Sequence, residues 1–189
     1  MPDVCTSTSA RPMNVLHRPR VGDAVLDAIS KRLSPNIHPL SDSEHPSALI
    51  AAKLDSACTS VDLIGHTTNG AIEVGKWTLS TSISDYDQQE FKRIGAAMRR
   101  RGVFQMRLLA CGSLRLTTLS GLVDLEDALN DGRSAGGSAI RVYGSQISLD
   151  ENCYDEVNHR FADGAACSLL RRAETLMQIA VTAATAGFR

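Results

Sequence analysis

The chain has 189 residues, of which 43% are hydrophobic, 4% are aromatic and 22% are charged, and its formal net charge is −1. This is enough apolar material for one domain with a buried core. The balanced charge argues against nucleic-acid or acidic-membrane partners, and the few aromatic residues argue against a stacking surface for single strands.

Targeting and redox features indicate a reducing environment. No stretch approaches the roughly 18 to 20 consecutive apolar residues of a membrane span, and the first residues lack the charged and apolar regions of a signal peptide. Five cysteines are scattered without any Cys-x-x-Cys spacing: Cys5, Cys58, Cys111, Cys153 and Cys167. We therefore expect no disulfide framework and predict a cytoplasmic location, with no membrane partner and no cofactor.

The first part of the chain is predicted to lead into one α/β domain. Residues 1–12 are rich in Ser, Thr and Pro and are predicted to form a flexible arm, and residues 13–189 a single domain. A short extended piece is expected at Met13–Leu16. A helix is predicted over Val21–Leu33, because apolar residues recur there every four positions: Val21, Val25, Ile29 and Leu33.

A proline-rich segment over residues 34–46 is predicted to be a loop, with His38 and His45 exposed to solvent. Pro46 suits the first position of a helix, which we expect to continue to about Ala57.

The central part begins with the apolar run Val61–Ile64, predicted to be a strand buried on both faces. Gly65-His66-Thr67-Thr68-Asn69-Gly70 follows, and its Asn-Gly pair favours a tight turn. Alternating residues over Ala71–Leu79 then predict a hairpin. Ser84, with Asp87 three positions later, predicts the start of a helix that ends at Gly102. The basic run Arg99–Arg101 then complements the dipole at that helix's C-terminus.

Further strands and helices are predicted in alternation. A second buried strand, Val103–Ala110, leads directly into Cys111-Gly112-Ser113. The remaining predicted elements are a helix over Thr118–Asn130, a strand over Ile140–Tyr143, an acidic loop over Gln146–Gly164 and a helix over Ala165–Ala184. Strands that alternate with helices predict an α/β fold, with a mostly parallel sheet flanked by helices on both faces.

Two predicted strand ends carry residues suited to thiol chemistry. His66 follows one apolar strand and Cys111 follows the next. Ligands gather beyond the carboxyl ends of parallel strands, so residues far apart in sequence can meet there. An imidazole can take the proton of a thiol or stabilise the thiolate. The alternative is structural: His66 would end a strand and Cys111 would be packing.

These two segments resemble caspase-like cysteine peptidases. Val61-Asp62-Leu63-Ile64-Gly65-His66, the turn at Gly70 with its hairpin, and Met106-Arg107-Leu108-Leu109-Ala110-Cys111-Gly112 are similar to the signature shared by caspases, metacaspases, gingipains and separases. The similarity is closer still to uncharacterised bacterial caspase-like domains. It covers about residues 60–145 and implies a caspase-like sheet with a hairpin after the His-bearing strand.

The resemblance implies that Cys111 is the nucleophile and His66 the base. It places the oxyanion donors at backbone amides around Cys111-Gly112 and directly after His66, at Thr67. Two positions depart from the family pattern. Thr67 stands where these peptidases usually have Gly, and Leu109 stands where caspases have an acidic or polar residue. Two functions therefore remain open: a cysteine peptidase-like hydrolase that cleaves a peptide bond with a Cys–His dyad, or a catalytically silent module that binds a protein partner.

The acidic loop adds candidates for substrate binding. Asp150, Asp155 and Glu156 would select a basic side chain, as in relatives that cleave after Arg or Lys; the alternative is a solvated acidic loop. Cys153 and His159 are too few for a structural zinc site, which normally has four protein ligands, so no metal is expected. A serine hydrolase and a nucleotide-binding protein are disfavoured, because the chain lacks Gly-x-Ser-x-Gly, a P-loop and Gly-x-Gly-x-x-Gly.

Overall fold

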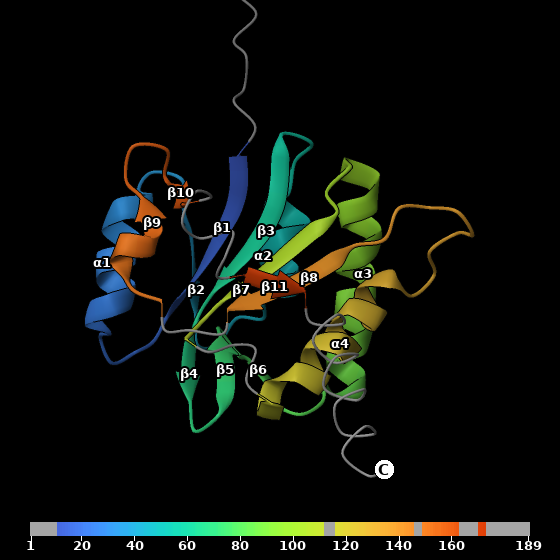
Figure 1. Cartoon of the computed structure of the whole chain (residues 1–189), viewed down its shortest axis with the longest axis horizontal. Helices are drawn as coiled ribbons and strands as arrows, with labels where there is room; N and C mark the ends of the chain where they lie inside the picture. The colour runs from blue at the N-terminus through green and yellow to red at the C-terminus, as the bar shows by residue number, and fades with distance from the viewer. Residues whose placement is uncertain (1–10, 112–115, 146–148, 163–169, 173–189) are drawn as a thin grey trace, which may run out of the picture.

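A six-stranded sheet forms the centre of the computed structural model, which describes residues 11–111, 116–145, 149–162 and 170–172 (Figure 1). The strand order is β2-β1-β3-β7-β8-β11; the first five strands are parallel and the last is antiparallel. The strands are β1 (Arg11–Arg18), β2 (His38–Ser41), β3 (Cys58–Ile64), β7 (Gln105–Leu109), β8 (Arg141–Ser145) and β11 (Leu170–Arg172). The fold is therefore α/β, as predicted from the alternation of strands and helices.

Helices cover both faces of this sheet. The described helices are α1 (Ala24–Leu33), α2 (Pro46–Lys53), α3 (Asp85–Arg101), α4 (Leu116–Asn130) and the short 3-10 helix η1 (Glu151–Cys153). One core joins the sheet to α2, α3 and α4, and a second, smaller core joins it to α1 and the chain around η1. None of the described helices combines the length and apolar character needed to cross a membrane.

A three-stranded antiparallel unit lies between β3 and α3 along the chain. It consists of β4 (His66–Thr68), β5 (Ala71–Val74) and β6 (Trp77–Leu79). The predicted tight turn is present between β4 and β5, where Asn69 and Gly70 both have positive φ angles, 51° and 81°. Alternating residues of β5 and β6 are fully buried, so the unit packs into the larger core, as the alternation in its sequence predicts.

Helix α3 matches its prediction closely. The Ser84 hydroxyl accepts a hydrogen bond from the backbone N–H of Asp87, and Gly102 ends the helix in a left-handed conformation. The last turn carries Arg99–Arg101, and Arg99 donates to the carbonyl of Leu129 at the end of α4. Arg99 therefore serves the ends of two helices, α3 and α4.

Two N-terminal predictions need correction. The first helix begins at Ala24, because Asp23 is its N-cap; Val21 is 83% exposed and Val25 41% exposed, so these two valines are not on its buried side. The proline-rich segment contains β2 at the sheet edge, where a strand with Pro39 needs pairing on one side only.

The C-terminal predictions also change. The segment after β8 is not an uninterrupted loop, because it contains η1 and a short hairpin. The two strands of this hairpin, β9 (Tyr154–Asp155) and β10 (Arg160–Phe161), have two residues each. Within the predicted helix over Ala165–Ala184, residues 170–172 instead form β11 and pair with β8. The rest of that predicted helix lies outside the described residues.

A row of polar residues crosses four strands on the face that α1 covers. The register pairs Asn14 with Asp62, Asp62 with Arg107, and Arg107 with Tyr143. Asp62 is fully buried; its Oδ1 accepts from Nε of Arg107 at 2.7 Å and from the hydroxyl of Ser60 at 2.8 Å. A second guanidinium nitrogen of Arg107 reaches Oδ2, so this buried carboxylate is paired and hydrogen-bonded on both oxygens.

Candidate active site

The pairing of β3 with β7 brings His66 and Cys111 to matching positions just beyond the carboxyl ends of these two strands. Ile64 is in register with Leu109, and the backbone N–H of Gly65 donates to the carbonyl of Leu109 over 3.3 Å. His66 and Cys111 each lie two residues beyond this last pair. Both residues line one hollow under α1, beside the core to which Ile64 and Leu109 belong.

Gly65 and β5 set the path of the chain into His66. A Cβ on Gly65 would overlap the carbonyl oxygen of Glu73 and the side chain of Val74, so the chain passes β5 at a distance that only glycine permits. His66 then pairs with Glu73 as the first residue of β4. It lies in a second, antiparallel sheet, beyond the end of β3 itself.

His66 and Cys111 line one small hollow, with a volume of about 60 Å³. The side chain of His66 is 50% exposed, and Cys111 is partly buried. The remaining lining is almost entirely apolar: Val25, Leu26, Ile29, Gly65, Leu109, Ala110, Leu149 and Tyr154. The predicted pair is therefore brought to a shared, accessible and apolar site.

The thiol of Cys111 contacts a backbone segment rather than the imidazole. Its Sγ lies 3.4 Å from both the carbonyl oxygen and the amide nitrogen of Leu149, donating to the first and accepting from the second. Within the described part of the chain, no hydrogen bond joins Cys111 to His66. The contact with Leu149 has no local signal in the sequence, because nothing near either residue specifies it.

Asp23 contacts His66 directly. Its Oδ2 lies 3.1 Å from Nδ1 of the imidazole, while its Oδ1 caps the first turn of α1. The sequence contained a sign of this residue, because an Asp directly before a helix is a preferred N-cap. The apolar spacing from Val21 placed the helix start three residues too early and concealed it.

The predicted oxyanion donors are only partly described. Gly112 lies outside the described residues. Thr67 is half-buried in β4, in register with Ile72 of β5, and its hydroxyl donates to the carbonyl of Cys111 over 2.7 Å. The Thr67 side chain thus links the two chain segments that carry His66 and Cys111.

The acidic residues of the loop are used mainly within the loop itself. Asp150 caps η1 through the amide of Asn152, and Asp155 accepts from the amides of Val157 and Asn158. The hydrogen bonds from Asn158 hold the pKa of Asp155 below its usual value. Glu156 is exposed, and none of the three carboxylates lines the hollow. From this segment, the hollow receives Leu149 and Tyr154.

Two other thiols, Cys58 and Cys153, lie in the described part of the chain. Burial raises the pKa of Cys58 and of Cys153. Nδ1 of His159 contacts the carbonyl of Arg32. Among the residues that the structure describes, no group of three or more His, Cys, Asp or Glu side chains is arranged to hold a metal ion.

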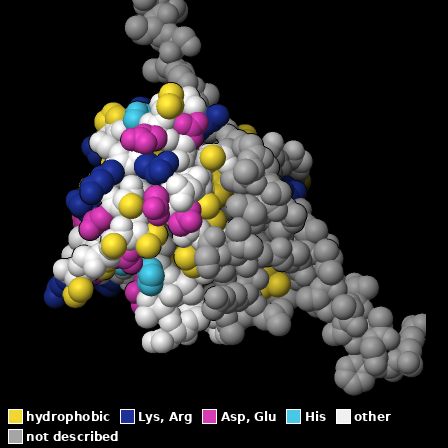
Figure 2. All heavy atoms as spheres, turned by 60° about the vertical axis from the view of Figure 1, so that its left-hand side comes forward, with side chains coloured by type: hydrophobic (Ala, Val, Ile, Leu, Met, Phe, Trp, Pro, Cys, Tyr) yellow, Lys and Arg dark blue, Asp and Glu magenta, His cyan; other side chains and the backbone are white. Residues whose placement is uncertain are grey.

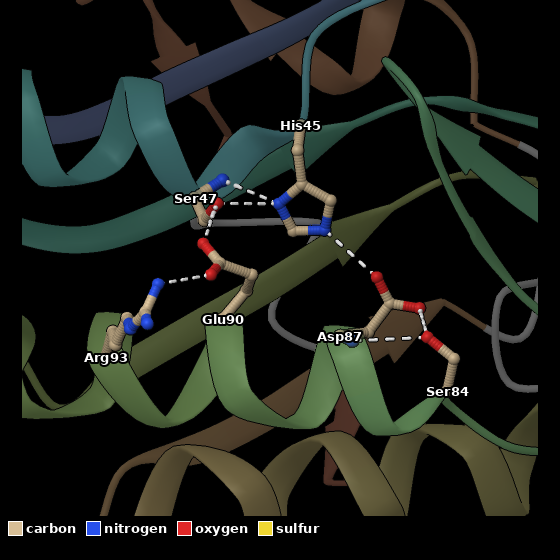
Figure 3. Close-up of polar contacts among 6 residues, drawn as sticks. All are labelled: His45, Ser47, Ser84, Asp87, Glu90 and Arg93. Atoms are coloured by element: carbon tan, nitrogen blue, oxygen red, sulfur yellow. Dashed lines mark hydrogen bonds and ion pairs between the residues drawn. The ribbon is translucent and has the colours of Figure 1, made fainter.

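A second cluster joins the start of α2 to α3 (Figure 3). Nδ1 of His45 lies 2.7 Å from the hydroxyl of Ser47, and Nε2 lies 3.2 Å from Oδ1 of Asp87. The order Ser–His–Asp is that of a hydrolase triad, but Ser47 is only 5% exposed and its hydroxyl donates to Glu90. The cluster is therefore a buried clasp between helices, and His45 is not the solvated residue that the sequence predicted.

The surface over α1 carries basic and acidic side chains interspersed with apolar ones (Figure 2). No large patch of one charge is visible on the described part of this face. Comparisons with other proteins add no assignment: no protein-family model, curated protein or solved structure significantly matches this chain.

Proposed function

We propose that the protein is a thiol hydrolase that cleaves a peptide bond with Cys111 as nucleophile and His66 as base. The observation that carries this proposal is that the two residues each lie two positions beyond one registered pair of strands and line one hollow. The hairpin after β3 and the helices on both faces of the sheet support the proposal, because the resemblance to caspase-like peptidases implies them.

The proposed reaction needs no group beyond the peptide, the protein and water. His66 takes the proton of Cys111, and Sγ attacks the peptide carbonyl carbon to form a C–S bond. Backbone amides near Cys111 and Thr67 hold the negative oxygen. The imidazolium gives its proton to the departing amine as the C–N bond breaks, and water then hydrolyses the thioester, with His66 again as base.

The hollow indicates the kind of side chain that fits beside the scissile bond. Its walls are apolar and its volume is about 60 Å³, which suits a small aliphatic side chain better than a long basic one. A basic substrate side chain would have to extend beyond the hollow to contact Asp150, Asp155 or Glu156, because these carboxylates lie outside it.

A second candidate is a silent module that binds a protein partner. The observation that favours it is the contact of Cys111 with both backbone groups of Leu149, which occupies the thiol. Hydrolysis would require this segment to move away from Sγ as substrate enters.

The test is the alkylation rate of Cys111 by iodoacetamide near neutral pH, measured by mass spectrometry in wild type, His66→Ala and Thr68→Ala. Thr68 is exposed on the same short strand as His66 and is the matched control. We expect Cys111 to react much faster than Cys58, and only His66→Ala to remove the difference. If Cys111 reacts no faster than Cys58, or is indifferent to His66, the hydrolase proposal fails and the binding module is favoured.

A further inference from the structure

Asp23 divides its carboxylate between two partners. Oδ1 accepts hydrogen bonds from the backbone N–H groups of Val25, at 2.9 Å, and Leu26, at 3.0 Å. Oδ2 lies 3.1 Å from Nδ1 of His66. Because the helix cap fixes the orientation of the carboxylate, its second oxygen is held against the imidazole. The side chain of Asp23 is only 19% exposed, which limits competition from water.

The two nitrogens of a neutral imidazole have opposite roles. One carries hydrogen and donates, the other has a lone pair and accepts, and the partner of one nitrogen determines the state of the other. A carboxylate oxygen at Nδ1 is an acceptor, so the hydrogen of His66 is placed on Nδ1. The lone pair is then on Nε2, the nitrogen that Asp23 leaves free.

We propose that Asp23 is the positioning residue of the site: it holds His66 in the tautomer whose Nε2 accepts the proton of Cys111. When the proton passes from Sγ to Nε2, the negative charge of Asp23 stabilises the imidazolium beside the new thiolate. This role rests on the proposed function of Cys111 and His66. Because partly exposed ion pairs contribute little to stability, its effect is expected in the chemistry of His66 rather than in folding.

The variant Asp23→Asn separates the two jobs of the side chain. Asn is as good an N-cap as Asp, so α1 is retained. Its amide group can donate to Nδ1, which moves the hydrogen of the imidazole to Nε2. Nitrogen-15 NMR of the His66 ring reports this change without any substrate. Alkylation of Cys111 by iodoacetamide near neutral pH is expected to slow by roughly tenfold, less than the roughly hundredfold or more that a general base itself supplies.

Asp27→Asn is the matched control, because Asp27 lies in the same first turn of α1 and is exposed. It is expected to change neither the His66 spectrum nor the Cys111 rate. In the background of His66→Ala, Asp23→Asn is expected to have no further effect on the rate, because its action passes through the imidazole.

The outcomes distinguish the role of Asp23 from the proposed function. If Asp23→Asn leaves the His66 tautomer unchanged, Asp23 is only a helix cap and the inference is overturned. If the variant changes the tautomer without slowing a fast Cys111, Asp23 does not position the base for Cys111, and the inference is likewise overturned. If the tautomer changes but wild-type Cys111 reacts no faster than Cys58, the hydrolase proposal fails while the control of His66 by Asp23 stands.

Discussion

The hydroxyl of Thr67 donates a 2.7 Å hydrogen bond to the main-chain carbonyl of Cys111. The bond joins the residue after the candidate base to the candidate nucleophile, across the end of the β3–β7 pairing. It supports the Cys111 backbone from the side of β4, where the ladder between the two parallel strands has already ended.

Replacing this hydroxyl is expected to loosen Cys111. Thr67→Val keeps the shape and the strand preference of the side chain but removes a bond worth about 1 kcal/mol. We expect Thr67→Val to slow the alkylation of Cys111 by roughly fivefold, whereas Thr68→Val on the same strand leaves the rate unchanged. Equal rates in the two variants would show that the bond does not position the thiol.

The apolar hollow predicts a preference among active-site labels. Peptidyl chloromethyl ketones with Ala next to the reactive group are expected to label Cys111 at least about tenfold faster than those with Arg, because a buried cation would lack a partner there. Iodoacetamide provides the rate without side-chain selection. Preference for Arg, abolished by Asp150→Asn, would instead assign selection to the acidic loop.

The buried pair of Asp62 and Arg107 is expected to be sensitive to the loss of one partner. Asp62→Asn should lower the free energy of unfolding by about 3 to 5 kcal/mol, because it removes the buried negative charge that faces the Arg107 guanidinium. Urea denaturation measures this, with the exposed Asp127→Asn as control. The double variant Asp62→Leu, Arg107→Met should be more stable than Asp62→Asn. If the double variant is less stable than Asp62→Asn, the electrostatic explanation is contradicted.

Close packing of α3 against α4 depends on Gly95. A Cβ at this position would overlap the backbone of Leu129, so Gly95→Ala forces the helices apart despite the better helix propensity of Ala. The expected cost is about 3 kcal/mol in thermal or urea unfolding. Gly22→Ala is the control, since the nearest atom to its new Cβ would be 3.9 Å away; similar losses in both would refute the packing argument.

Acid is expected to weaken the clasp around His45. Burial lowers the pKa of His45 from the ordinary 6.5, so the unfolded chain binds a proton there before the folded protein does. This stability is present above about pH 6.5 and is lost as the pH falls toward the folded-state value. His45→Asn, which can still cap α2, should reduce the difference in unfolding free energy between about pH 7.5 and pH 5.5. An unchanged difference would assign the acid sensitivity to other groups, such as His17 and His38, whose pKa values burial also lowers.

Elements with complete local signals were predictable. Helix α3 has a cap, an apolar stripe and a terminal glycine in its own sequence, and the β4–β5 turn has Asn69-Gly70. The shared edge for His66 and Cys111 followed from a general property of parallel sheets. These features depend on the chemistry of neighbouring residues or on the topology of the whole class.

Elements defined by distant partners were not predictable. Strand β2 exists because β1 offers a free edge, and β11 because β8 does, although apolar residues around Leu170 recur at helical spacing. The contacts of Asp23 with His66 and of Leu149 with Cys111 likewise join segments far apart in the chain. Single-sequence patterns contain propensity and periodicity, but not which distant segment completes a hydrogen bond.

The register between β3 and β7 has a consequence for how such a site tolerates evolutionary change. His66 and Cys111 follow two neighbouring strands of one sheet, β3 and β7, whose register fixes where the segment between the two residues begins and ends. Insertions at the Asn69-Gly70 turn or before α3 would lengthen this segment without moving His66 or Cys111. Related sequences could thus acquire new loops beside the hollow while the two side chains keep their positions in space, although their separation in sequence would grow.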